Sequence, residues 1–374
     1  MAMMILLKNA HVLAPEDLGI QDILVCGGEI AAMGRKLGDG FAKVVQEDLG
    51  GRIVCPALID QHVHIIGGGG EAGPESRVPP LSFSDCLSAG VGTLVGVLGT
   101  DSITRSLRDL VAATKALGRL GLTAYCLSGA YAYPSPTLMG NVGDDVMFVQ
   151  EMLGVKLAIS DHRCLHPTTE QIFNLASQVR VAALIAGKPG VVHCHVGREE
   201  QGIEQLIEIA KTTSLPIFHL RPTHMGGHID QGIEFMRLGG YVDVTTSSKN
   251  ADKDAMRYLE ENPALLTLSS DSNGSMPKWD SSGSVVGITR GRLTENMKTM
   301  IKMNRKGVPL PQVLCTMTSN VADALLLRDK GRIAEGKDAD LLILNDNLGI
   351  DAMMAHGVWM RHDGKNLRKG IYED

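Results

Sequence analysis

Short and almost continuously apolar runs recur along the middle of the chain, and most are followed by an amphipathic stretch. Continuous apolarity, rather than strict alternation with polar residues, is typical of parallel strands that are covered on both faces. Leu107–Leu120 repeats apolar residues at spacings of three and four, and Gln201–Lys211 has a similar pattern, so both are predicted helices. The predicted strands are Ala57–His64, Thr93–Gly99, Thr123–Tyr131, Gly154–Ile159, Gly190–Val196, Pro216–Thr223, Tyr241–Thr246 and Leu265–Asp271.

Eight strand–helix units over about 270 residues match the size of a (β/α)₈ TIM-like barrel. A doubly wound open sheet is the competing arrangement. The two ends of the chain differ from the middle, because they alternate short β-type runs with turn signals such as Cys26–Glu29 and His362–Lys365. Neither end is long enough to bury a core alone. We therefore predict that residues 1–55 and 325–374 together form a small β-sandwich domain beside a barrel of residues 56–324.

The composition argues against three classes of protein: nucleic-acid binders, membrane proteins and secreted disulfide-linked proteins. The chain has 374 residues and a formal net charge of −6, with no Lys/Arg-rich stripe, which argues against a nucleic-acid partner. No apolar stretch approaches the roughly 18 residues of a membrane span. The start, Met1–Lys8, lacks a basic region and a cleavage site, so it is predicted to be a strand rather than a signal peptide. Seven irregularly spaced cysteines favour a reducing, cytoplasmic location over a disulfide framework.

The first chemical feature is the sequence Asp60-Gln61-His62-Val63-His64. Residues two apart in a strand face the same side, so His62 and His64 can point at one metal ion. If this is the first barrel strand, the pair lies at the end where active sites of that fold are found. The alternative is a hydrogen-bonded pair of histidines at a strand edge.

Three further candidate ligands stand at the ends of later strands: His195, His224 and Asp271. Imidazole and carboxylate together are the ligand set expected for Zn²⁺ or a similar ion. His193 and His219 precede the better-placed histidines, so we expect them to be packed deeper in the barrel.

Lys156 lies inside the apolar strand Gly154–Ile159. Burial disfavours the charged ammonium and so favours the neutral amine. A neutral amine can add CO₂ and become a carbamate, which is an anion able to bridge two metal ions. The alternatives are a lysine paired with a carboxylate, or one whose amine reaches the strand end.

The combined pattern resembles the binuclear amidohydrolase superfamily. Within it, the sequence is similar to the isoaspartyl (β-aspartyl) dipeptidases over nearly its whole length. The stretches that carry this resemblance are Asp60–Pro74 (DQHVHIIGGGGEAGP), Leu98–Ser102 (LGTDS), Ser128–Tyr131 (SGAY), Gly154–Arg163 (GVKLAISDHR), Gly187–Gly190 (GKPG) and Leu268–Ser275 (LSSDSNGS).

The resemblance implies two divalent metal ions, which we expect to be Zn²⁺. It assigns one ion to His62 and His64, the other to His195 and His224, and the bridge between them to Lys156 as N6-carboxylysine. Two ions that share one water lower its pKa enough to supply hydroxide near neutrality. Asp271 would bind a metal, take the proton and pass it to the leaving amine, while Tyr131 would donate to the developing oxyanion.

The same resemblance implies a zwitterionic dipeptide substrate. Glu71 would meet the ammonium group, and Arg163 would offer a bidentate fork to a carboxylate. Thr100, the backbone of Gly69 and Ser275 would be secondary contacts. We also expect a homo-oligomer without nucleic-acid or membrane partners.

One position departs from the family pattern. An arginine thought to hold a substrate carboxylate stands three residues after the sixth-strand histidine in the family, but here that residue is Gly227. Nearby His228 and Arg221 are candidate replacements, although neither is aligned with it.

The prediction is thus a zinc-dependent metallopeptidase that cleaves the isopeptide bond of β-aspartyl dipeptides. The alternative enzyme is a cyclic-amide hydrolase of the dihydroorotase or hydantoinase type. A cyclic imide has no ammonium for Glu71, so this residue discriminates between the two. The alternative from another class is a barrel scaffold that has lost catalysis.

Overall fold

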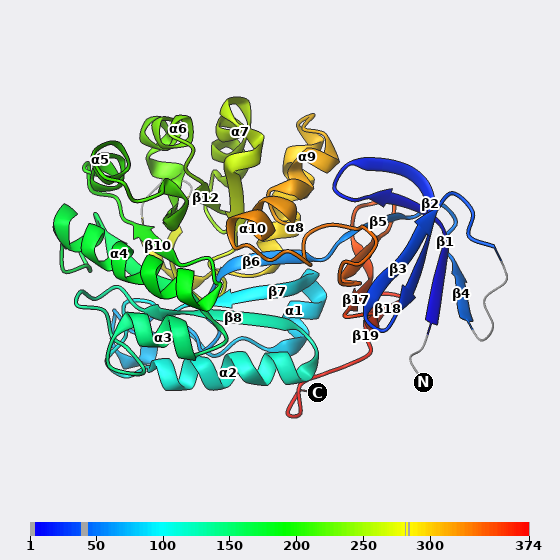
Figure 1. The fold of residues 1–374 in the computed structure, drawn as a ribbon, viewed down its shortest axis with the longest axis horizontal. Helices are drawn as coiled ribbons and strands as arrows, with labels where there is room; N and C mark the ends of the chain where they lie inside the picture. Colours follow the sequence, from blue (N-terminus) through cyan, green and yellow to red (C-terminus); the bar gives the residue numbers. More distant parts are fainter. Residues whose placement is uncertain (1–3, 39–43, 281, 283–284, 374) are drawn as a thin grey trace.

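The computed structural model describes residues 4–38, 44–280, 282 and 285–373. Figure 1 shows two parts: strands surrounded by helices, and a separate β-sheet at the other end of the long axis. The C-terminal tail leaves this sheet and returns to the helical part, where Glu373 accepts backbone hydrogen bonds from Phe83 and Ser84.

All eight predicted central strands are present and run parallel in chain order. Six form one sheet in the order β11-β10-β9-β8-β7-β6, and β12 pairs with β13. The sheet curls, because β11 lies beside β12, β13 lies beside β6, and Val63 forms a parallel bridge with Ser272. The strands are β6 (Leu58–Val63), β7 (Val91–Gly96), β8 (Thr123–Gly129), β9 (Met152–Ile159), β10 (Val191–Val196), β11 (Leu220–Thr223), β12 (Val242–Thr245) and β13 (Leu266–Ser269).

Helices cover the outside of this curled sheet (Figure 1). The predicted helix over 107–120 is α2, which begins after Ser106, whose side chain accepts a hydrogen bond from the Asp109 amide, and ends at left-handed Gly121. The predicted helix over 201–211 is α5, which begins three residues later. The helices are α1 (Phe83–Ala89), α2 (Leu107–Leu120), α3 (Val142–Phe148), α4 (Thr169–Ala186), α5 (Glu204–Thr212), α6 (Ile229–Arg237), α7 (Ala251–Glu261), α8 (Thr294–Arg305), α9 (Leu310–Cys315) and α10 (Ser319–Ala324).

Among the residues that the structure describes, this part also contains four short 3₁₀ turns and one hairpin. The turns are η1 (Pro74–Ser76), η2 (Ile217–His219), η3 (Met225–Gly227) and η4 (Pro263–Leu265). The antiparallel hairpin of β14 (Ser275–Trp279) and β15 (Val285–Arg290) follows β13, and the sequence pattern did not predict it.

The other sheet joins both ends of the chain. Its strand order is β19-β18-β17-β16-β5-β1-β2-β3, with β4 on β1 as well. Its apolar face buries a second core that includes Ile5, Val54 and Ile343. These nine strands therefore form one continuous sheet around their own core. They are β1 (Met4–Leu13), β2 (Asp17–Cys26), β3 (Glu29–Gly34), β4 (Val44–Asp48), β5 (Ile53–Pro56), β16 (Leu341–Leu344), β17 (Ile350–Ala355), β18 (Val358–His362) and β19 (Lys365–Asn366).

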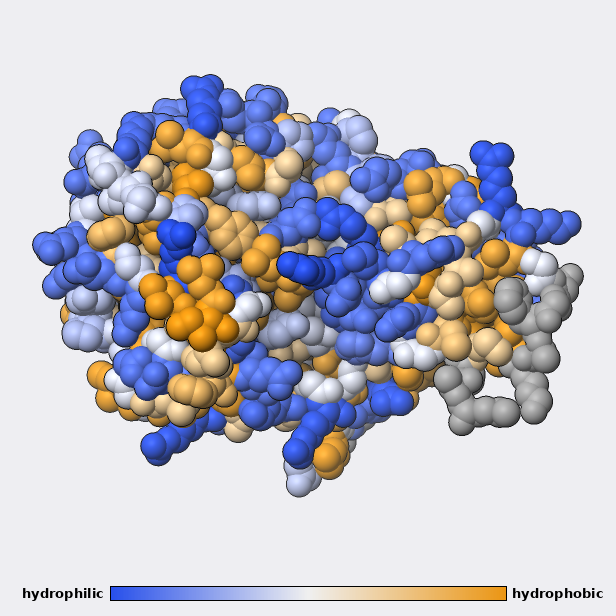
Figure 2. Space-filling view, viewed as in Figure 1, coloured by the Kyte–Doolittle hydropathy of each residue, from blue (hydrophilic) through white to orange (hydrophobic). Residues whose placement is uncertain are grey.

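The surface is mixed in hydropathy (Figure 2). Exposed apolar side chains on α3 and α4 include Phe148, Leu184 and Ile185. Among the described residues, no helix has the length and apolarity needed to cross a membrane. The homo-oligomer predicted from the sequence stays a prediction.

Candidate metal centre and substrate cavity

The two histidines of the first central strand meet an aspartate from beyond the last. His62 is the second-last residue of β6, and His64 directly follows the end of that strand. Asp271 lies two residues after the end of β13. Asp271 Oδ1 is 3.4 Å from His62 Nε2 and 3.1 Å from His64 Nε2. All three residues are buried, and in the described part of the chain they form the group whose ligand atoms lie within 4.8 Å of one another.

The backbone is unusual where two of the candidate ligands leave their strands. His224 has φ 68° and Asp271 has φ 52°, both in the left-handed region. Such conformations cost a non-glycine residue of the order of 1–3 kcal/mol, and they concentrate at functional sites. Here each one turns the chain at the carboxyl end of a strand, so that the side chain lines the cavity.

Lys156 lies below this group, in the interior of β9. Its side chain is fully buried, and its Nζ is 3.2 Å from His62 Nε2. Burial lowers the pKa of the Lys156 amine to about 7, so a large fraction is neutral near neutral pH. The neutral amine is the form that adds CO₂. Lys156 is thus a buried strand lysine beside the candidate metal ligands, and its carboxylation stays a prediction.

The other two candidate ligands, His195 and His224, lie beside this group, but their ring nitrogens contact other side chains. The His195 and His224 ring centroids are 4.5 Å apart. His195 contacts Tyr131 Oη through Nδ1 at 2.6 Å and Asp161 Oδ2 through Nε2 at 2.8 Å. His224 Nδ1 is 2.5 Å from Thr245 Oγ1. One His195 nitrogen would have to release its partner before this residue could bind a metal.

The charge state of the histidines suits metal binding. Burial, with the nearby Lys156 ammonium, holds the pKa of His62 well below its ordinary value. Burial likewise lowers the pKa of His195 to about 4 and that of His224 well below the usual range. For Asp271, burial opposes ionisation, but the neighbouring His64 and His224 rings hold its pKa below the ordinary value. Neutral imidazoles with an ionised carboxylate are the protonation states that a metal requires.

Unpartnered buried atoms indicate that this set fits a cation. His64 Nδ1 is buried without a hydrogen-bond partner, and Asp271 Oδ1 is buried with the His64 and His62 Nε2 atoms nearby but in no well-aligned hydrogen bond. A buried carboxylate oxygen without a donor is costly unless a cation or water meets it. The His62, His64 and Asp271 group thus has the geometry of a metal site, whereas His195 and His224 supply a second pair of imidazoles beside it.

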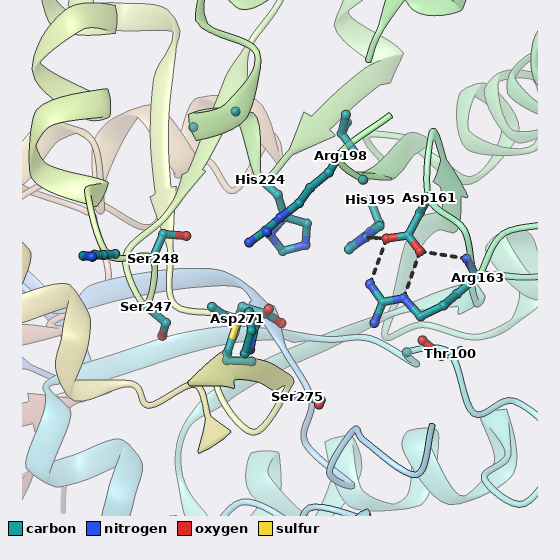
Figure 3. A pocket seen from close by; sticks show the side chains of 18 of the residues that line it. Thr100, Asp161, Arg163, His195, Arg198, His224, Ser247, Ser248, Asp271 and Ser275 are labelled. Carbon is teal, nitrogen blue, oxygen red and sulfur yellow. Dashed lines mark hydrogen bonds and ion pairs between the residues drawn. The ribbon is translucent and has the colours of Figure 1, made fainter. Parts of the chain in front are cut away.

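An ion-pair network forms one wall of the cavity. The Arg163 fork donates from Nε and Nη2 to the two oxygens of Asp161, each at 2.8 Å, and Nη1 donates to Glu71 Oε1 at 3.1 Å. The hydrogen bond from Arg163, together with that from His195, holds the pKa of Asp161 well below its usual range even though burial raises it. Asp161 therefore connects Arg163 to His195 (Figure 3). The Arg163 guanidinium was predicted to bind a substrate carboxylate, and in this structure two of its nitrogens bind Asp161 instead.

One cavity of about 960 Å³ unites these groups. It is lined by every predicted substrate contact and by most of the candidate ligands, whereas His62 and Lys156 are buried and do not line it. Figure 3 shows His195, Asp161, Arg163 and Thr100 on one side, and Ser247 and Ser248 on the other. The predicted residues that line it are His64, Gly69, Glu71, Thr100, Tyr131, Arg163, His195, His224, Asp271 and Ser275.

Sequence reasoning missed two buried aspartates. Asp161 stands two residues before Arg163 and two residues after the end of β9, and a charged residue close behind a buried strand was the available signal. Asp243, in β12, accepts hydrogen bonds from Gln61, Thr223 and Ser269. This buried network joins β12 to β6, β11 and β13. His193 was expected to pack deeper, and it is buried with its Nε2 3.1 Å from His62 Nδ1.

Comparisons with known proteins agree with this description. The model of the family described as "Amidohydrolase family" matches residues 168–356. The chain is 25% identical to imidazolonepropionase from Ruegeria pomeroyi, over 81% of each chain. It is 23% identical to L-hydantoinase from Paenarthrobacter aurescens, over 93% of this chain and 86% of that one. The chain belongs to the amidohydrolase family.

Within that superfamily, the likeness is to the isoaspartyl (β-aspartyl) dipeptidases. The structure superimposes on that of β-aspartyl dipeptidase from Fervidobacterium islandicum AW-1, solved in complex with a β-Asp-Leu dipeptide, with a TM-score of 0.92. The two chains are 37% identical, and the match covers 99% of this chain and 100% of the other. The resemblance inferred from the sequence motifs is thereby confirmed. The superfamily neighbours also imply a TIM-like barrel for the curled parallel sheet.

Proposed function

We propose that the protein is a binuclear metal-dependent dipeptidase that hydrolyses the isopeptide bond of β-aspartyl dipeptides. The observation that carries this proposal is the combination of two features in one cavity. The His62, His64 and Asp271 group offers a cation site, and the neighbouring Glu71 and Arg163 offer one charge of each sign. A zwitterionic amide substrate needs both features.

The proposed metal ligands are those that the family resemblance implies, and the His62, His64 and Asp271 group supports part of this set. His62 and His64 would bind one divalent ion with Asp271, His195 and His224 would bind the other, and Lys156 would bridge them as a carbamate. Zn²⁺ suits this imidazole and carboxylate set best. When bound, two such ions lower the pKa of a shared water and so supply a nucleophile near neutral pH.

The substrate is oriented by the ion-pair wall. Glu71 and Arg163 are 3.1 Å apart, and each side chain is 25% exposed, so both are within reach of a ligand. The β-aspartyl residue carries an α-ammonium and an α-carboxylate on one carbon. Its insertion would give Glu71 the ammonium and Arg163 Nη1 the carboxylate, while Asp161 keeps the rest of the guanidinium in place. Thr100, the Gly69 backbone and Ser275 line the same cavity and are the proposed secondary contacts.

Two side chains would act on the reacting amide. Asp271 is ionised at neutral pH, so it can take a proton from the attacking water and return it to the departing amine. Tyr131 keeps its proton, because burial raises the pKa of its hydroxyl well above the ordinary value. A neutral tyrosine can donate to the oxygen that becomes negative. In this structure its hydroxyl contacts His195, so binding of a metal by His195 would free it for this role.

The rival functions predict different chemistry in the same cavity. A cyclic-amide hydrolase has no use for a carboxylate that binds ammonium, and Glu71 occupies a cavity wall beside Arg163. A non-catalytic scaffold would have no need to keep five candidate ligands around one buried lysine. Both readings are therefore less well supported than the dipeptidase.

The remaining parts of the proposal concern organisation. We propose a (β/α)₈ barrel over residues 56–324 and a small β-sandwich domain of residues 1–55 with 325–374. A homo-oligomeric, cytoplasmic enzyme is the expected form.

The test combines metal content with turnover. Protein purified without chelator should contain about two equivalents of metal and hydrolyse β-Asp-Leu. Dialysis against a chelator should remove both, and Zn²⁺ with bicarbonate should restore both. α-Asp-Leu is the matched control, since it has the same atoms with the peptide bond on the other carboxyl group. Turnover that survives complete metal removal would refute the proposal.

A further inference from the structure

The cavity extends beyond the groups that the proposed function uses. Glu71 and Arg163 occupy one side, whereas Arg198, Lys249 and Lys278 are further cationic residues of the lining. The second residue of a β-aspartyl dipeptide carries its own α-carboxylate, only two bonds from the amide nitrogen that departs. A group that recognises this carboxylate must therefore lie near the candidate metal ligands. This inference rests on the proposed function.

The sixth central strand does not provide such a group. Gly226 and Gly227, directly after His224 and Met225, have no side chains. The next residue, His228, is turned to the backbone, where its Nε2 donates to the Gly197 carbonyl at 2.9 Å. Arg221 is buried between Phe218 and Tyr241, with its guanidinium carbon 4.4 and 4.3 Å from the two ring centres, and it does not line the cavity. Both replacements considered from the sequence are thus poorly placed.

Arg198 is the cation that the neighbouring strand supplies. It stands three residues after His195, just past the end of β10. Figure 3 shows its side chain extending across the cavity, with the guanidinium directed away from the Asp161–Arg163 ion pair. A planar guanidinium can bind a carboxylate through two parallel hydrogen bonds, which a lysine cannot do.

We propose that Arg198 binds the α-carboxylate of the leaving residue and so makes this enzyme selective for dipeptides with a free C-terminus. The substrate then lies across the cavity, with the β-aspartyl residue at Glu71 and Arg163 and the leaving residue at Arg198. Arg198 is a binding residue here and does not take part in proton transfer.

Gly227 provides a matched rescue position. Its φ is not in the left-handed region, and a Cβ at Gly227 would meet no heavy atom within 4 Å. An arginine at this position can therefore be introduced without a clash at its first carbon. Gly227→Arg in an Arg198→Met background moves the cation from the end of β10 to the end of β11 while the cavity keeps its net charge.

The experiment compares β-Asp-Leu with its C-terminal amide in wild type and variants. A charge-assisted hydrogen bond corresponds to a change of about 10- to 150-fold in kcat/KM. Wild type should prefer the free acid by that factor. Arg198→Met should lower kcat/KM for the free acid by the same factor, mainly through a higher KM. It should change kcat/KM for the amide little, because amidation and the substitution remove the same interaction. Gly227→Arg should restore part of the preference. Lys249→Met and Lys278→Met, which remove other lining cations, should retain it.

The outcomes separate this inference from the proposed function. Equal losses on the acid and the amide would mean that Arg198 acts on folding or on the cavity as a whole, and would overturn the inference alone. So would a retained preference in Arg198→Met, or its loss in a lysine variant instead. If wild type hydrolyses neither substrate when loaded with Zn²⁺, the proposed function fails, and the inference fails with it.

Discussion

Lys156 offers a prediction whose size can be worked out from the structure. Its amine is fully buried, and burial lowers its pKa from 10.5 to about 7. At about 1.36 kcal/mol per pH unit, this corresponds to about 5 kcal/mol of unfavourable free energy for the buried ammonium. Lys156→Met keeps a side chain of similar length and removes the charge. Metal-free Lys156→Met should therefore be more stable than metal-free wild type at pH 7.

The pH dependence follows from the same two pKa values. Between pH 7 and 10.5 the unfolded lysine holds its proton, while the folded one has released it. The unfolded state binds more protons, so this group makes wild type more stable as pH rises. The contribution should grow by about 2 kcal/mol between pH 7 and pH 9, and the advantage of Lys156→Met should shrink by the same amount.

Urea unfolding of chelated protein, at several pH values, measures this difference. Other titrating groups, such as the buried cysteines, affect both proteins equally and cancel in the comparison. Lys211→Met, which changes a half-exposed lysine on α5, is the matched control and should show no such trend. A stability difference between wild type and Lys156→Met that is constant from pH 7 to pH 9 would show that the amine does not become neutral in this range. The argument for its carboxylation would then lose its basis.

Further predictions concern turnover by metal-loaded enzyme. Asp271→Asn should lower kcat about 10²- to 10⁴-fold on β-Asp-Leu, as expected for a proton-transfer group, and wild-type kcat in this variant would exclude that role. In wild type, Asp271 should stay ionised down to about pH 4, because its pKa is lowered, so kcat/KM should not fall through this group above that pH; an acid-limb pKa of kcat/KM above about 5 that Asp271→Asn abolishes would contradict this. Tyr131→Phe should lower kcat by about 10²- to 10³-fold with little change in KM, so a change confined to KM would argue against a hydrogen bond formed in the transition state. Glu71→Gln should lower kcat/KM about 10- to 150-fold, and N-acetylation of the substrate should add little to this loss; fully additive losses would mean that Glu71 does not meet the ammonium.

The fold was predictable where the chain carries a local pattern. The eight central strands are uniform apolar runs, and α2 has both an apolar stripe and residues that cap its ends. The hairpin of β14 and β15 was missed because it contains Pro277, which is unfavourable inside a strand, and lacks apolar alternation. Predicted strand 216–223 begins later than expected, since η2 occupies Ile217–His219 and leaves only the last four residues in β11.

The candidate site was predictable in its membership more than in its contacts. His62, His64 and Asp271 come together because the carboxyl ends of parallel strands meet at one edge, which is a rule of topology. The contact between Arg163 and Asp161, and the two partners of His195, depend on rotamers chosen within the folded cavity. No local pattern encodes those choices. Asp161 was therefore missed, although it connects the ion-pair wall to a candidate ligand.

The most direct test of the account is a substrate panel with metal-loaded wild-type enzyme. The measurement is kcat/KM for β-Asp-Leu, α-Asp-Leu and a cyclic ureide such as dihydroorotate or hydantoin. We predict that β-Asp-Leu is hydrolysed with the highest kcat/KM, by at least about 10²-fold, because it alone presents an ammonium and a carboxylate on the carbon beside the reacting arm. A higher kcat/KM for the cyclic ureide would contradict the proposed function and favour the cyclic-amide hydrolase.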